Sequence, residues 1–274
     1  MSEVAPKVVS HSTEGELMND LLDLIHVDDR TTVSPVIFHA PHGSTNIPAG
    51  LRHTLLLNDA ALAAELYAMT DHNTDQLAGL SAETTDASLI RSDLSRLIVD
   101  IEKFPGEAEE LFKVGMSAMY TKTSQGEQLR SEPFTVWPEY AELEEFYEAY
   151  GRAFADLTAR ALAANGRAII IDVHSYPVQA QPYEIHSHEA RPEIDLGVDD
   201  SHTPAALVAA ARQAFAGFEC GENQSFHGTY VPLDFYGTDT RVSSIMLEIR
   251  RDMIETRRDE VQAAITRLAS LLAE

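Results

Sequence analysis

Apolar residues follow two different spacings in the middle of the chain. In the segment 139–164 they recur every three or four positions, which is the stripe expected of one long helix. That stripe consists of Tyr140, Leu143, Tyr147, Tyr150, Phe154, Leu157 and Ala161. Asn165-Gly166 then predicts the end of the helix. The next residues, Ala168 to Ile171, are apolar without alternation, which indicates a central parallel strand covered on both faces.

The same two spacings predict further elements along the chain. We expect helices over 14–25, 58–70, 202–218 and 251–272, and strands over 33–38, 167–173 and 242–249, with mixed strand pieces in 88–101. Asn58 or Asp59 is the expected N-cap of the second helix. Segment 102–138 is rich in Gly, Pro, Ser and Thr and predicts a long excursion over the surface, a kind of loop that is usually functional or disordered.

Strands that alternate with helices imply a mixed, largely parallel sheet between two helical layers, a three-layer αβα sandwich. We expect a loose tail over residues 1–13 and one α/β domain over 14–274. The length of 274 residues suits one large α/β domain.

Composition and charge narrow the possible partners. Twenty basic residues against 44 acidic ones give a net charge of −24, which disfavours nucleic acid and anionic membranes as partners. A small anionic substrate would therefore need a local arginine. No apolar run is long enough for a membrane span, the N-terminus lacks a secretory pattern, and the single Cys220 excludes an internal disulfide. We expect a cytoplasmic protein, and the sequence leaves its oligomeric state open.

Candidate chemistry lies where predicted strands end. "VIFHAPHG" leads to His42, "IIIDVHS" leads to His174, and Glu248 lies in "SIMLEIRRD". In open α/β sheets, ligands bind outside the carboxyl ends of the strands, and imidazoles with a carboxylate are typical ligands of catalytic zinc. Structural alternatives remain open at this point. Each histidine could be a hydrogen-bonded structural residue, Asp172 could cap local amides, and Glu248 could be an exposed partner of Arg250.

Six segments carry a resemblance to a known family. They are "APHGSTNIP", "TDHNTDQLAG", "DLSRLIVDIEKFPGE", "IIIDVHSYP", "NQSFHGTYVP" and "SIMLEIRRDMI". In this order, over about residues 34–255, the chain resembles the N-formylglutamate amidohydrolases. The resemblance implies an αβα sandwich related to zinc carboxypeptidases. It also implies zinc-dependent hydrolysis of the N-acyl, or formyl, amide of an acidic amino acid such as N-formyl-L-glutamate.

By that resemblance, one Zn²⁺ per chain, or another divalent metal, is bound by His42, Asp71 and His174. Thr45 stands where related carboxypeptidases have a glutamate ligand, so Asp71 is chosen as the third ligand. Asp75 and His72 are reserves, and Asp71 could instead cap a helix over 72–80.

The resemblance also implies roles for residues around the metal. Glu248 corresponds to a catalytic general base. Arg96 would bind the substrate carboxylate or polarise the scissile carbonyl, with an ion pair to Asp100 as its structural alternative. Further candidates for substrate binding are Arg91, His227, Gly228, Tyr230 and Arg250.

The chain departs from the family pattern in ways that concern the substrate. Glu102 and Lys103 replace an Asn-Arg pair, and His227 replaces a basic residue. Loop 104–131 differs as well, and its residues Gly115, Tyr120 and Arg130 are candidates for a lid. Two alternatives therefore remain: a metal-dependent hydrolase of another N-acyl amino acid or peptide-like amide, or a non-catalytic module that binds a small anion. No P-loop supports phosphate binding.

Overall fold

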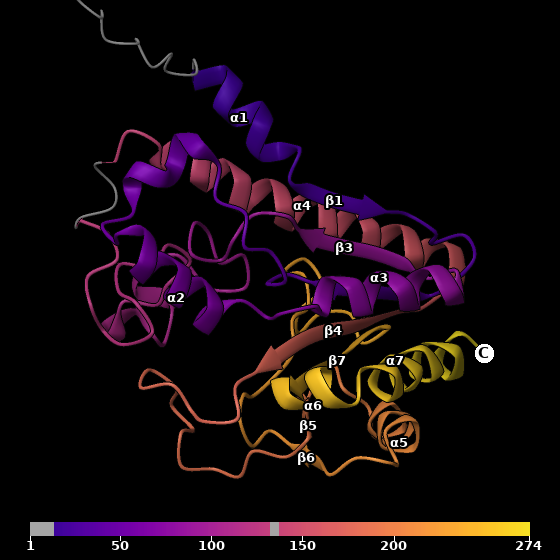
Figure 1. The fold of residues 1–274 in the computed structure, drawn as a ribbon. Coiled ribbons are helices and arrows are strands. Elements are labelled where there is room, and N and C mark those ends of the chain that lie inside the picture. Colours follow the sequence, from indigo (N-terminus) through magenta and orange to yellow (C-terminus); the bar gives the residue numbers. More distant parts are fainter. Residues whose placement is uncertain (1–13, 132–136) are drawn as a thin grey trace, which may run out of the picture.

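The computed structural model describes residues 14–131 and 137–274, and one mixed sheet joins both halves of this chain (Figure 1). The strands lie in the order β1-β3-β2-β4-β7-β5-β6. Their bounds are Ile25–Asp28 (β1), Val36–Ala40 (β2), Ser88–Ser92 (β3), Ala168–Tyr176 (β4), Ile194–Gly197 (β5), Cys220–Glu222 (β6) and Val242–Arg250 (β7). β3, β2, β4 and β7 are parallel neighbours, as are β5 and β6, whereas β1 and β5 pair antiparallel with β3 and β7.

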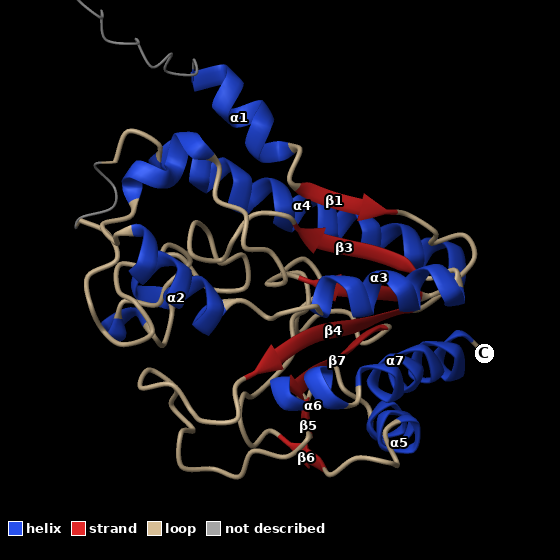
Figure 2. Ribbon diagram, in the orientation of Figure 1, coloured by secondary structure: helices blue, strands red, loops and turns tan. Residues whose placement is uncertain are grey.

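Helices cover both faces of this sheet (Figure 2). Their bounds are Glu14–Leu22 (α1), Asp59–Met69 (α2), Thr74–Thr85 (α3), Tyr140–Asn165 (α4), Ala205–Ala214 (α5), Arg251–Thr256 (α6) and Arg258–Ala273 (α7). Within residues 14–131 and 137–274, short 3-10 helices span Ala49–Thr54, Gly106–Ala108 and Phe112–Val114. The core between α1, α2, α4 and one sheet face is separate from the core between α3, α5, α6, α7 and the other face. The predicted three-layer αβα architecture is therefore confirmed.

Strand β4 shows how the sheet leads to a polar site. Successive side chains of a strand point to opposite faces. Ile170 packs into the α4-side core, whereas Ile171 and Val173 pack into the α7-side core. Asp172 and His174 continue the face of Ile170, and both are buried. The polar pair therefore extends the α4-side core toward the carboxyl end of the strand.

Several element boundaries differ from the predicted ones. The first helix ends at Leu22, because Ile25 begins β1 and pairs with Ser92 of β3. The last helix is interrupted at Arg257, and the predicted helix 202–218 shortens to α5. The short strands β5 and β6 were missed. By contrast, α4 was predicted within one residue at each end.

Predicted helix ends are confirmed in two places. Gly166 follows α4 with a φ of 73°, a left-handed conformation that suits glycine. The side chain of Asn58 accepts a hydrogen bond from the backbone amide of Ala61 and caps α2.

The prediction of a surface excursion over 102–138 was wrong for the buried residues 109, 111, 115–121, 123, 124, 129 and 130, whereas residues such as 104, 105 and 125–128 are exposed as expected. The side chains of Leu111, Met116, Tyr120 and Leu129 belong to the α4-side core. Arg130 is fully buried and donates hydrogen bonds to three backbone carbonyls, those of Leu97, Ile98 and Tyr120. The segment forms an inner wall without regular strands. Residues 132–136, like the expected tail 1–13, lie outside the described part of the chain.

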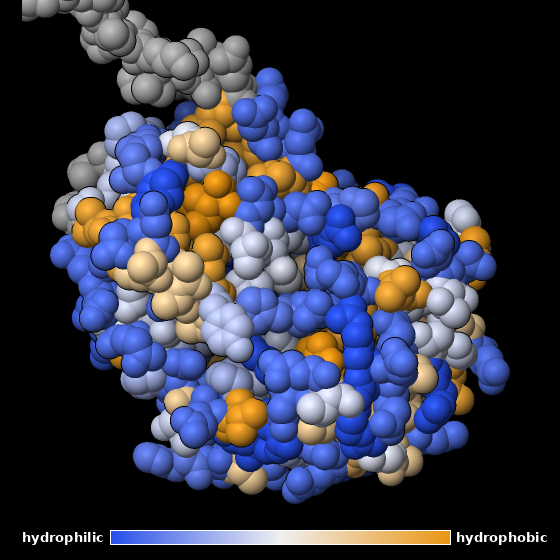
Figure 3. Space-filling view, viewed as in Figure 1, coloured by the Kyte–Doolittle hydropathy of each residue, from blue (hydrophilic) through white to orange (hydrophobic). Residues whose placement is uncertain are grey.

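Hydrophilic residues predominate on the face of the molecule seen in Figure 3, with scattered apolar patches between them. Among the described helices, none combines the length and apolar character needed to cross a membrane.

Candidate active site

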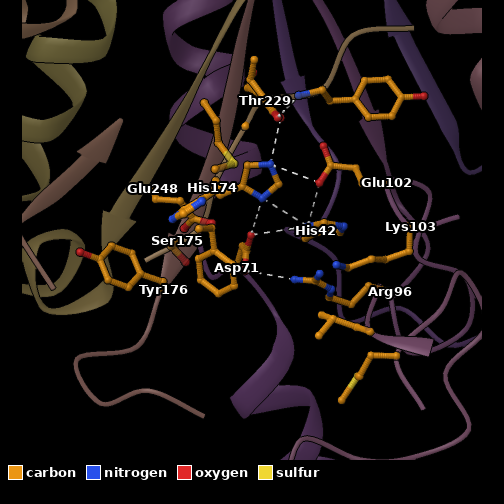
Figure 4. A pocket seen from close by; sticks show the side chains of 18 of the residues that line it. His42, Asp71, Arg96, Glu102, Lys103, His174, Ser175, Tyr176, Thr229 and Glu248 are labelled. Atoms are coloured by element: carbon orange, nitrogen blue, oxygen red, sulfur yellow. Dashed lines mark hydrogen bonds and ion pairs between the residues drawn. The ribbon is translucent and has the colours of Figure 1, made fainter. Parts of the chain in front are cut away.

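Three adjacent parallel strands bring the predicted site residues together (Figure 4). His42 follows β2 in the turn between Pro41 and Gly43, and His174 and Glu248 lie near the carboxyl ends of β4 and β7. Asp71 lies between α2 and α3, where its backbone amide donates to the carbonyl of His42 over 3.0 Å. His42, Asp71 and His174 therefore meet at the carboxyl ends of the central strands.

The predicted metal ligands form a compact triangle of donor atoms. Nδ1 of His42 lies 3.3 Å from Nδ1 of His174, and Oδ2 of Asp71 lies 3.0 Å from the latter and 3.7 Å from the former. Ligands at 2.0–2.1 Å from a tetrahedral zinc are separated by about 3.3–3.4 Å. The donor set and its spacing thus fit a tetrahedral metal ion such as zinc.

Each histidine of this triangle has a carboxylate behind it. Nε2 of His42 lies 2.9 Å from Oδ1 of Asp100, and Nε2 of His174 lies 2.9 Å from Oδ1 of Asp172. Metal-binding histidines usually donate their other N–H to a carboxylate or carbonyl, which fixes the ring and its tautomer. The arrangement therefore leaves both Nδ1 atoms free to face a common ion.

A second buried group lies directly behind His174. Nδ1 of His39 is 2.9 Å from Oδ1 of Asp172 and 3.4 Å from Oε1 of Glu102. The His39 ring packs against Phe154, with 4.6 Å between ring centroids. Oδ1 of Asp172 thus contacts both His39 and His174, and this connection fixes the carboxylate that orients His174.

The protonation behaviour of the triangle reflects a local surplus of carboxylates. Burial lowers the pKa of His174, but Asp172 and Glu102 outweigh it and hold that pKa well above the usual range. Burial raises the pKa of Asp71, but hydrogen bonds from His174 and His42 hold it far below the usual range. The site therefore favours added positive charge, whether a proton or a metal ion.

Glu248 is a buried carboxylate beside these groups, and one of its oxygens lacks a hydrogen-bond partner among the described residues. Its side chain is 6% exposed, and Oε2 is buried with no hydrogen-bond partner among the described residues. Burial raises its pKa well above the usual range, and Asp71 adds to this shift while His174 opposes it. The alternative that Glu248 is an exposed partner of Arg250 is wrong, because Arg250 pairs with Asp252 over 2.8 Å.

Arg96 forms the predicted ion pair with Asp100 and also lines the cavity. Its Nη2 pairs with Oδ2 of Asp100 over 2.7 Å, and its Nε contacts both that oxygen and the Tyr120 hydroxyl. Its Nη1 lies 3.7 Å from Oδ1 of Asp71. The structural ion pair therefore holds the guanidinium, while one nitrogen remains directed at Asp71 of the triangle.

Comparison with known proteins places the chain in a family. The model of the N-formylglutamate amidohydrolase family matches residues 34–255, most of the chain. The chain belongs to the N-formylglutamate amidohydrolase family. An N-formylglutamate deformylase of Pseudomonas aeruginosa is 25% identical over 225 residues, which cover 78% of this chain and 80% of that protein. The chain is therefore an amide hydrolase by family.

Two solved structures share the fold. An N-formylglutamate amidohydrolase from Ralstonia eutropha JMP134 aligns with a TM-score of 0.70 at 16% identity, covering 91% of this chain and 96% of that one. A protein from Agrobacterium tumefaciens aligns with a TM-score of 0.65 at 20% identity, covering 91% and 93%.

The predicted site residues of this family member line a cavity of about 400 Å³. Its lining includes His42, Asp71, Arg96, His174 and Glu248, together with the predicted substrate-side residues His227, Gly228 and Tyr230. Gly228 has a φ of 82°, which a side chain would disfavour. The His227 ring stacks on that of His186, with 3.7 Å between centroids.

Other predicted site residues lie elsewhere in this amidohydrolase. Arg91 and Arg250 do not line the cavity: Arg91 pairs with Asp93 over 2.9 Å, just as Arg250 pairs with Asp252. Of the three lid candidates, Tyr120 lines the cavity, whereas Gly115 and Arg130 do not.

The reserve ligands also lie outside the triangle. Nε2 of His72 bonds the carbonyl of Tyr67, and Asp75 packs beside Gly43, where an added Cβ would lie 2.8 Å from the Asp75 Cβ. Neither belongs to the group that could hold an ion. Asp71 does not cap α3, because Asn73 occupies the N-cap position.

Some site residues were not assigned from the sequence. Asp172 stands two positions before His174, and the period of a strand places both on one face, so this signal was available. Arg251 lines the cavity although its neighbour Arg250 was chosen. The alternation of side chains along β7 ends at Arg250, and α6 begins at Arg251. The strand period therefore does not predict which of the two side chains faces the cavity.

Proposed function

We propose that this chain hydrolyses the amide bond of an N-formyl amino acid with the help of one bound zinc ion. The observation that carries the proposal is the triangle of His42, Asp71 and His174, beside which Glu248 retains an unpartnered carboxylate oxygen. The relative from Pseudomonas aeruginosa is named for N-formylglutamate, so N-formyl-L-glutamate is the reference substrate.

The donor set supports zinc as the metal. Two imidazoles and one carboxylate leave the fourth position that catalytic zinc sites keep for water or substrate. When bound, zinc would lower the pKa of water to about 7 and polarise the acyl carbonyl.

Glu248 is suited to move the proton. A general base works best when its pKa lies near the working pH, and burial raises the pKa of this carboxyl. Glu248 would accept a proton from the attacking water and pass it to the amide nitrogen. The new C–O bond then replaces the C–N bond, and formate and the free amino acid leave.

Arg96 is suited to stabilise the charge that develops on the carbonyl oxygen. Its Nη1 points toward the ligand triangle, and its other nitrogens are fixed by Asp100 and Tyr120. A donor that is already fixed in place costs little reorganisation when charge appears.

The proposal is tested by metal analysis together with an amine-release assay. The purified protein should hold about one zinc per chain, release free amine from N-formyl amino acids, and lose this activity when a chelator removes the metal. Zinc should restore the activity. Tight binding of a small anion without metal and without turnover would instead favour the non-catalytic module.

A further inference from the structure

Among the described residues that line the cavity, the lysines and arginines are Arg96, Lys103 and Arg251. Lys103 is already neutralised, because its Nζ lies 3.1 Å from Oε1 of Glu109. The other oxygen of Glu109 accepts from the backbone amide of Phe104. Positive charge for a substrate anion is therefore supplied by the two arginines.

Arg251 is held in place by backbone carbonyls instead of a carboxylate. Its Nη1 donates to the carbonyls of Tyr67 and Ala68 near the end of α2, over 3.2 and 2.9 Å. Its Nε is buried without a hydrogen-bond partner among the described residues. Its Nη2 approaches a carboxylate only at 3.9 Å, at Oδ1 of Asp71. This charge is thus fixed in direction but not neutralised at close range.

The two arginines meet on one side of Asp71. Nη1 of Arg96 and Nη2 of Arg251 lie 3.7 and 3.9 Å from the same Oδ1, too far for hydrogen bonds. The other oxygen, Oδ2, faces His42 and His174. A carboxylate that enters beside this triangle would therefore meet Nη2 of Arg251, which lacks a strong partner, next to the nitrogen that Arg96 directs at the triangle.

The remaining wall of the cavity is largely apolar. Its apolar side chains include Phe104, Leu111, Met116, Val231, Leu233 and Met246. A volume of about 400 Å³ lies within the ~300–1,000 Å³ typical of pockets for ligands larger than a small acid. Among the described residues of this wall, the one Lys or Arg besides the two arginines is Lys103, which already pairs with Glu109. A second substrate carboxylate would therefore lack a free cation here, and an unpaired buried charge is costly.

We propose that Arg251 binds the single α-carboxylate of an N-formyl amino acid whose side chain is large and apolar, while Arg96 keeps its place beside the acyl carbonyl. This inference rests on the proposed function. It departs from the acidic substrate that the family resemblance implies, and it assigns to Arg251 a role that the sequence suggested for Arg250.

Binding measurements test this inference without requiring turnover. Calorimetry on zinc-loaded protein carrying Glu248→Gln would compare N-formyl-L-phenylalanine, N-formyl-L-glutamate and N-formyl-L-phenylalaninamide, whose carboxylate is blocked. At pH 8 an ordinary imidazole is mostly neutral, so a histidine adds little to anion binding. We expect the phenylalanine compound to bind at least about tenfold more tightly than the glutamate compound.

Variants at two neighbouring arginines provide the matched comparison. Adding Arg251→Met should weaken binding of N-formyl-L-phenylalanine about 10- to 100-fold and leave the amide analogue within about twofold, because only the former presents a carboxylate. Arg250→Met should change neither affinity. Equal weakening of both ligands by Arg251→Met, or tighter binding of the glutamate compound by the Glu248→Gln protein, would overturn the inference.

Turnover by the unmodified protein separates the two proposals. If it binds the phenylalanine compound preferentially but hydrolyses no N-formyl amino acid, the proposed function fails and the substrate class stands. If it hydrolyses and binds N-formyl-L-glutamate best, the function stands and the substrate class fails. The ligand preference needs no variant at position 251, so a folding defect there does not remove the test.

Discussion

The two sides of the cavity are built in different ways. On the side of the triangle formed by His42, Asp71 and His174, the residues His174 and Glu248 lie on paired strands, and each imidazole of the triangle has a carboxylate behind it. On the substrate side, the wall comes from the irregular segments around 102–120 and 226–236 and is mostly apolar. The contrast indicates that the sheet fixes the chemistry while the irregular segments determine which molecule reaches it.

The largest effect is expected when a proposed metal ligand is removed. We expect His174→Ala to lose bound zinc and all measurable turnover, because the triangle then retains only two donors. Metal content after purification and amine release are the readouts. The matched control is His72→Ala, whose imidazole bonds the Tyr67 carbonyl outside the triangle and whose loss should leave metal content unchanged. Full zinc content in the first variant would contradict the assignment.

The next effect separates proton transfer from metal binding. Glu248→Gln should lower kcat by about 10²–10⁴-fold, the usual contribution of a general base, while zinc remains bound. Asp252→Asn, which alters a partner of Arg250 outside the cavity, is the control. An unchanged kcat would show that Glu248 is not the base.

A smaller effect is expected from the carboxylate behind a metal ligand. Asp100→Asn should weaken zinc binding about 10–100-fold, because Asp100 orients His42 through Nε2. Competition with a chelator of known affinity measures the change. The comparison variant Asp93→Asn affects an acid that pairs with Arg91 away from the cavity, and its zinc affinity should match that of the unmodified protein.

The smallest effect is expected for Arg130, which supports the irregular segment 102–131 and should affect stability. Arg130→Met leaves the carbonyls of Leu97, Ile98 and Tyr120 without their buried donor, so we expect a loss of about 1–3 kcal/mol in the free energy of unfolding. Urea denaturation measures this loss. The control is Arg152→Met, at an exposed arginine that pairs with Glu145 and Glu148. Its free energy of unfolding should stay within about 1 kcal/mol of that of the unmodified protein. Equal stability of both variants would contradict a structural role for Arg130.

The sequence predicted the regular parts of this protein better than its irregular parts. The stripe of α4 and the apolar run of β4 depend on local periodicity, and so does the approach of His174 to the edge of the sheet. Asp71 was found by family resemblance, since its position between two helices has no periodic signal. The burial of segment 102–131 was missed because its polar, glycine- and proline-containing composition resembles that of an exposed loop, and tertiary contacts such as those of Arg130 outweigh composition.

The strand pairing of β4 and β7 has a consequence beyond support. His174 and Glu248 are direct neighbours on the paired strands β4 and β7. The backbone hydrogen bonds between these strands therefore fix the distance between the two residues' backbones at the strand spacing of roughly 4.8 Å. Inserting one residue into either strand would turn the following side chain to the opposite face of the sheet. Insertions in the flanking loops carry no such penalty, so this scaffold can diversify its substrates while its reactive spacing stays constant.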